Sequence, residues 1–319
     1  DRTKRGMIGV ITHEVGHNFF PMIVNSDERQ WTWMDEGINS FVEILAELKY
    51  DPVLFAKNPA KDITRYMGGD QSNISPIMSQ GDYVKQFGPN AYSKPAAGLY
   101  MLRKTIMGPE LFDHAFRTYS QRWMFKHPTP ADFFRSMEDA SGMDLDWFWR
   151  GWFYTTDVTD IGIKSVKKLY ATDKQTDRIK NIIEKNPAAK KSIENLGELI
   201  YISDKKEDLN IDALKKYSKG GKEITPYLYQ VEFEKPGGLV MPIIVELTFE
   251  DGTKERKTIP AQIWMRNDNK ATKVFASSKE VKSIKIDPDF ETADVDMSNN
   301  SWPKKEESKF DKMKNKVKG

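Results

Sequence analysis

The spacing of apolar residues changes once along this chain of 319 residues, and that change limits the folds open to it. From residue 1 to about 155, apolar side chains recur every three or four positions, as in "RGMIGVITHEVGHNFF" and "WMDEGINSFVEILAEL", which predicts amphipathic helices. From about 223 to 292 the period falls to two. In "IVELTFEDGTKERKTI" apolar and polar residues alternate, and Asp251-Gly252 supplies a tight hairpin turn. These two patterns predict a multidomain α + β protein.

We divide the chain into four segments on this basis. Residues 1–155 are expected to form a mainly α-helical lobe, and residues 223–300 a small antiparallel β-sandwich. Residues 156–222 are expected to form a connecting segment that is partly helical, although "DIGIKSVKKLY" within it could be a strand. Residues 301–319 contain "KKEESKFDKMKNKVKG" and are expected to form a disordered basic tail, because so polar a stretch buries too little apolar surface to fold.

Composition and charge exclude several classes of function. The formal net charge is only +2, which argues against nucleic acid as a partner, and no apolar run is long enough for a membrane span. Cysteine is absent, so disulfides, thiolate metal ligands and a cysteine nucleophile are excluded, while the compartment stays open. The chain begins "DRTKRGMIG", without an initiator Met. We therefore expect the C-terminal part of a longer protein, with any targeting segment upstream.

The stretch "GVITHEVGHNFF" places two histidines four residues apart. On a helix His13 and His17 share one face, so their ring nitrogens can meet at one point. Nitrogen ligands in this arrangement suit zinc. Glu14 lies about 100° around the helix from His13. It is placed to accept a proton from a zinc-activated water rather than to bind the metal. A single histidine on an apolar helix face is normally structural, but two imidazoles there are costly to bury without a purpose.

A catalytic zinc needs a third protein ligand and an open fourth position. The pattern H-E-x-x-H-x-x-G-x-x-H of one zinc-protease class fails here, because position 20 is Phe and position 23 is Ile. A glutamate on the next predicted helix is the alternative. "WTWMDEGINSF" supplies Glu36, with 18 residues between it and His17. Two antiparallel helices joined by a short connection would bring its carboxylate to the histidine face.

"HEVGH", followed after 18 residues by the glutamate of "WMDEG", resembles the gluzincin aminopeptidases, the family of aminopeptidase N and leukotriene hydrolase. Thermolysin-type enzymes are similar, with a spacing longer by one. The resemblance implies a thermolysin-like zinc-binding lobe with one Zn²⁺ per chain. It also implies a zinc-dependent metallopeptidase, most simply an aminopeptidase that hydrolyses N-terminal peptide bonds. The resemblance further implies that His13, His17 and Glu36 are the metal ligands and that Glu14 is the general base.

A second match lies in "NAYSKPAAGLYMLRKTIMG". The family has a tyrosine in a Y-x-K-G-type stretch that opens a helix and donates a hydrogen bond to the oxyanion of the tetrahedral intermediate. By resemblance that residue is Tyr92, although Pro95 replaces the usual glycine. A phenol suits the role because it is a neutral donor whose bond strengthens as charge develops.

Three residues near the glutamate ligand are candidates for supporting the metal site. Glu43 lies two turns beyond Glu36 on the same helix face and could orient a histidine N–H. Asp35 and Asn39 flank Glu36. For each of the three, a role in helix pairing or at the surface is equally open.

The family's Gly-x-Met-Glu-Asn motif, whose glutamate binds the free amine of the substrate, has no counterpart in this chain. We expect it in a missing N-terminal lobe of the same protein, which would be a partner of this chain beside the peptide substrate. Two alternatives to an aminopeptidase stay open. One is an endopeptidase or epoxide hydrolase on the same zinc frame, and the other is a non-catalytic scaffold relative.

Overall fold

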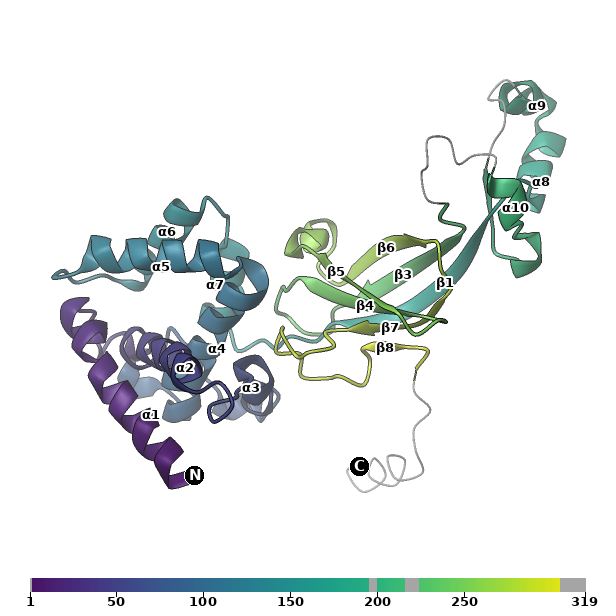
Figure 1. Cartoon of the computed structure of the whole chain (residues 1–319). Helices are drawn as coiled ribbons and strands as arrows, with labels where there is room; N and C mark the ends of the chain where they lie inside the picture. Colours follow the sequence, from purple (N-terminus) through teal and green to yellow (C-terminus); the bar gives the residue numbers. More distant parts are fainter. Residues whose placement is uncertain (1, 195–199, 216–223, 305–319) are drawn as a thin grey trace.

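The computed structural model describes residues 2–194, 200–215 and 224–304, and Figure 1 shows the helices of residues 2–154 gathered at one end, with the two sheets beside them. The helical part extends to Tyr154. Its α-helices are α1 (Arg2–Gly16), α2 (Ile38–Tyr50), α3 (Pro59–Met67), α4 (Lys94–Met101), α5 (Pro109–Trp123), α6 (Pro130–Ser141) and α7 (Asp146–Tyr154). Shorter helical turns are η1 (Asn18–Ile23), η2 (Trp33–Gly37), η3 (Gln71–Asn73), η4 (Gly81–Tyr83), η5 (Gly88–Ser93) and η6 (Leu102–Ile106).

The core of the helical part is aromatic. Trp33, at the start of η2, stacks on Phe134 of α6 with ring centroids 5.8 Å apart, and its centroid lies 4.7 Å from that of Phe153 of α7. Trp149 of α7 also stacks on Phe134, with ring centroids 4.6 Å apart. Such rings bury much apolar area at fixed geometry, so they lock α6 and α7 against the segment that carries Glu36.

The strands form two four-stranded antiparallel sheets. The strands are β1 (Gly162–Thr172), β2 (Tyr201–Ser203), β3 (Tyr227–Glu234), β4 (Ile243–Phe249), β5 (Lys254–Ile259), β6 (Lys270–Ser277), β7 (Val281–Ile286) and β8 (Ser301–Trp302). One sheet has the order β2-β1-β3-β6 and the other β5-β4-β7-β8. In register, Val231 pairs with Val166 and Lys273, and Val245 pairs with Lys257 and Ile286.

Alternation along the strands builds the core of this part. Tyr229, Val231 and Phe233 of β3 are buried on one face, as are Val245 and Leu247 of β4, and all belong to one hydrophobic cluster. The β4–β5 hairpin turns at Asp251-Gly252 as predicted. Gly252 has φ +81°, a left-handed conformation that glycine adopts without strain. The expected class, helices followed by antiparallel strands, is confirmed.

The first sheet begins earlier than residue 223. Strands β1 and β2 come from the segment 156–222, which we expected to be a connection. The possible strand in "DIGIKSVKKLY" is present as β1, although the exposed Lys164 and Lys167 obscure its alternation of apolar and polar residues. The rest of the segment is partly helical, as expected. It contains α8 (Asp177–Lys185), α9 (Pro187–Glu194), η7 (Lys206–Asp208) and α10 (Ile211–Leu214), which extend from the end of β1 in Figure 1.

The sheet region contains one further turn and ends in a short strand. A further turn, η10 (Ala261–Arg266), joins β5 to β6. Ser301 and Trp302, which we placed in a disordered tail, pair with β7 as β8, and residues 305–319 of that predicted tail lie outside the described residues. Among the described residues, no helix combines the length and apolar character that crossing a membrane requires.

Candidate metal centre

The centre depends on a close approach of α1 to α2. At Gly16 an added Cβ would lie 2.1 Å from Oδ1 of Asn39, so only glycine fits at this contact. Asn39 is buried, and its Nδ2 donates to the backbone oxygen of His13 at 2.8 Å. Asn39 therefore serves the helix pairing, one of the two roles left open for it. The contact brings the His13 and His17 face of α1 onto the helix that follows Glu36.

Three ligand atoms converge at this contact. Nε2 of His13 lies 3.1 Å from Nε2 of His17 and 3.1 Å from Oε2 of Glu36, and Nε2 of His17 lies 3.3 Å from the same oxygen. A tetrahedral zinc with ligands at about 2.0–2.1 Å separates neighbouring ligand atoms by roughly 3.3 Å. The triangle formed by His13, His17 and Glu36 therefore has the size that zinc requires, and these three form the one such group of metal-binding side chains among the described residues.

The partners of the opposite ring nitrogens fix the tautomers. Nδ1 of His13 faces Oε2 of Glu43 at 3.1 Å. Nδ1 of His17 faces the carbonyl oxygen of Phe20 at 2.9 Å and Oδ1 of Asp35 at 3.1 Å. All of these partners are acceptors, so each neutral ring carries its proton on Nδ1.

Both Nε2 lone pairs then point at each other and at a carboxylate oxygen. Three acceptors held about 3 Å apart repel one another unless a cation lies among them. The donor set, two imidazoles and one carboxylate, also suits zinc. The residues present therefore fit the metal.

Two of the supporting candidates, Glu43 and Asp35, thus contact the histidines. The contact of His17 with the carbonyl oxygen of Phe20 was not predicted from the sequence. Pro21 was a signal for this contact, because a proline biases the residue before it towards an extended backbone. Phe20 has φ −121° and ψ 107°, which breaks the helix and turns its carbonyl to His17. Burial raises the pKa of Asp35 to about 7, with the negative charge of Glu36 adding to the rise. Burial also raises the pKa of Glu43, against the opposing effect of Lys57.

The other two predicted residues border the triangle. The ring of Tyr92 stacks on that of His13, with centroids 5.7 Å apart. Burial, with the nearby carboxylate of Glu36, raises the pKa of Tyr92 well above its ordinary value, so the phenol keeps its proton. Glu14 is exposed on the open side of α1 and has no hydrogen bond or ion pair to any described residue. Its carboxylate is therefore available to a ligand.

A buried lysine anchors the helix that follows Tyr92. The ammonium of Lys94, 1% exposed, donates to the backbone oxygen of Thr155 at 3.3 Å and lies 5.5 Å from the ring centroid of Trp152. Trp152 in turn donates from Nε1 to the backbone oxygen of Lys94 at 2.9 Å. Burial lowers the pKa of Lys94 to about 8, and Asp157 opposes this only in part. These contacts fix α4, and with it η5 and Tyr92, against α7.

Comparison with known proteins identifies a family for the helical part of the chain. Residues 1–152 match the model of the peptidase family M1 domain. These residues belong to peptidase family M1. The M1 domain contains every predicted site residue, and the gluzincin aminopeptidase family recognised from the sequence is confirmed.

Relatives and a solved structure resemble the chain over different ranges. Human glutamyl aminopeptidase is 24% identical over 168 residues, which cover 50% of this chain and 17% of that protein. Leukotriene A-4 hydrolase of Xenopus laevis is 23% identical over 164 residues, 47% of this chain and 27% of that protein. The chain thus spans only 17% to 27% of the length of these relatives. A crystal structure of Legionella pneumophila aminopeptidase A in complex with aspartic acid aligns over 90% of this chain and 26% of its own, with a TM-score of 0.54 and 15% identity, which shows a shared fold.

Proposed function

We propose that this chain carries the zinc-binding part of a metallopeptidase, and that the whole protein is an aminopeptidase. The observation that carries the proposal is the triangle of acceptor atoms from His13, His17 and Glu36, with sides of 3.1–3.3 Å. In the proposal the helical part is a thermolysin-like lobe, and the two sheets form the β-sandwich that follows it.

Each residue of the centre has a defined task in this mechanism. When bound, zinc polarises the scissile carbonyl and lowers the pKa of water. Glu14 accepts the proton of the attacking water and later passes it to the leaving amine. Tyr92 donates a hydrogen bond to the oxygen on which negative charge develops. Glu43, and Asp35 with the Phe20 carbonyl, hold the two imidazoles in the tautomer whose Nε2 atoms are free to bind metal.

The aminopeptidase form of the proposal rests on the relatives, among which glutamyl aminopeptidases recur. Leukotriene A-4 hydrolase among them keeps an epoxide hydrolase as the second candidate. A non-catalytic scaffold is disfavoured because Glu14, Tyr92 and the three ligands are all present together.

The outer face of α1 supports a further part of the proposal, that residues of the same protein preceding Asp1 pack there. No residue of α1 is buried. Met7, Val10, Ile11 and Val15 are each more than half exposed, on the side that also carries Glu14. Apolar side chains in such a stripe normally face a partner. A lobe on this face would exclude water from Glu14 and the metal. It would also supply the binding site for the substrate amine, for which this chain has no motif.

The test is Glu14→Gln in the full-length protein, with Glu184→Gln on α8 as the matched control. Metal analysis should find one zinc per chain in both variants, because Glu14 is not a ligand. Release of the first residue from peptides with a free amino terminus should be lost only in Glu14→Gln. Turnover retained by that variant would refute the assignment of the base. Cleavage of peptides with an acetylated amino terminus would favour an endopeptidase.

A further inference from the structure

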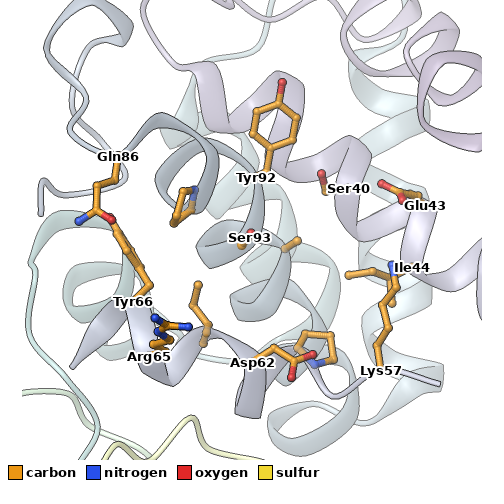
Figure 2. Close-up of a pocket in the computed structure, with 14 residues that line it drawn as sticks. Ser40, Glu43, Ile44, Lys57, Asp62, Arg65, Tyr66, Gln86, Tyr92 and Ser93 are labelled. Carbon is orange, nitrogen blue, oxygen red and sulfur yellow. The ribbon is translucent and has the colours of Figure 1, made fainter. Parts of the chain in front are cut away.

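A cavity of about 530 Å³ lies beside the metal centre, between α2, α3 and η5 (Figure 2). Two of its lining residues contact the centre itself. The Glu43 carboxylate faces Nδ1 of His13, and the Tyr92 ring stacks on the same imidazole. Figure 2 shows these residues towards one side of the cavity, and Lys57, Asp62 and Arg65 along the opposite side. A peptide held at the metal could therefore extend one of its groups into this cavity.

The charged groups of the cavity differ in whether they already have partners. Lys57 forms an ion pair with Glu47, whose side chain is 3% exposed, and Glu43 is held by His13. Arg65 and Asp62 make no side-chain hydrogen bond or ion pair with any described residue. These two are the charges of the cavity left for a ligand.

Among the free groups, Arg65 offers the largest set of donors, while the serine hydroxyls can both donate and accept. The guanidinium of Arg65 offers five N–H donors in a planar fork, a shape matched to a carboxylate. The hydroxyls of Ser40 and Ser93 also line the cavity and have no partner among the described residues. Asp62, the one free acceptor-only side chain, lies in the first turn of α3, where the helix dipole already offsets its charge.

We propose that this cavity binds a carboxylate of the peptide substrate and that Arg65 is the residue that selects it. The proposal rests on the peptidase function proposed above and adds a substrate class to it. The carboxylate has two sources in a peptide, an acidic side chain or the free C-terminus.

The test uses the full-length, zinc-loaded protein and matched peptides. One arm compares Glu with Gln at the first residue, a second makes the same comparison at the second residue, and a third compares a free C-terminus with its amide. We expect KM to be about fivefold lower for the carboxylate form in one arm, the size of a partly exposed charge pair, with kcat little changed. Arg65→Met should remove this difference. Lys61→Met, on the same helix with its ammonium over the Phe290 ring, should keep it.

Peptide binding without turnover, and the effect of Asp62→Asn, separate a failure of this proposal from a failure of the peptidase assignment. Binding of the same peptides to the Glu14→Gln protein, followed by calorimetry, needs no turnover, so it tests the cavity even if the peptidase assignment fails. A discrimination that is equal in the wild type and Arg65→Met in every arm would overturn the proposal. So would a preference for Lys-containing peptides that Asp62→Asn abolishes.

Discussion

The packing of Gly16 against Asn39 gives the sharpest prediction about the metal centre. In Gly16→Ala the new Cβ would lie 2.1 Å from Oδ1 of Asn39. Asn39 is 1% exposed and donates to the His13 carbonyl, so it has little room to turn away. The helices must then separate by roughly 1 Å to restore ordinary contact. Overpacking of this kind costs about 1–3 kcal/mol of stability.

The same separation should weaken metal binding. Zinc sites hold their ligand distances to about 0.2 Å, so moving the histidines of α1 away from Glu36 by several times that amount should lower zinc affinity at least tenfold. Gly6→Ala is the matched control, because Gly6 lies on the same helix and nothing lies within 4 Å of its added Cβ. That variant should keep zinc affinity and gain about 0.5–1 kcal/mol from helix propensity.

Urea denaturation gives the stability of both variants, and competition with a chelator gives their zinc affinity. The reasoning is refuted if Gly16→Ala matches Gly6→Ala in both measurements. A loss of stability with unchanged zinc affinity would show that the ligands are not positioned by this helix contact.

Two other predictions follow from the contacts around the centre. Glu43→Gln should lower zinc affinity about tenfold to a hundredfold, because the carboxylate that orients His13 is lost; chelator competition should show no such change in Glu110→Gln, and an unchanged Glu43→Gln would contradict the role. For Lys94, whose folded pKa is about 8 against 10.5 unfolded, the unfolded chain holds the extra proton between these pH values, so stability from this group rises with pH across that window. Below about pH 8, burying the charged ammonium lowers the free energy of unfolding by the full amount of about 3 kcal/mol. After about 1 kcal/mol for the lost hydrogen bond, Lys94→Met should gain about 2 kcal/mol at neutral pH, and the gain should vanish by pH 10.5. Urea denaturation across this range, with Lys104→Met as control, checks the sign, and a gain independent of pH would contradict it.

Local features of this protein could be read from the sequence because each depends on neighbours in the chain. The four-residue spacing that sets His13 and His17 on one face is a property of any helix. The hairpin at Asp251-Gly252 needed only a turn signal between alternating strands. The sequence indicated a possible strand at β1, but it did not show that this strand joins the first sheet, because exposed lysines interrupt the alternation of apolar and polar residues.

By itself, the sequence determined which residue types this protein offers to a metal and which helix face presents two of them. Only the tertiary structure decided that Glu36 meets the two histidines at 3.1–3.3 Å, that the Phe20 carbonyl fixes a tautomer, and that Arg65 shares a cavity with Tyr92. The physical reason is that these contacts join separate elements, so they depend on how closely the helices approach one another. That distance is set by packing, such as the absence of a side chain at Gly16, and spacing along the chain does not contain it.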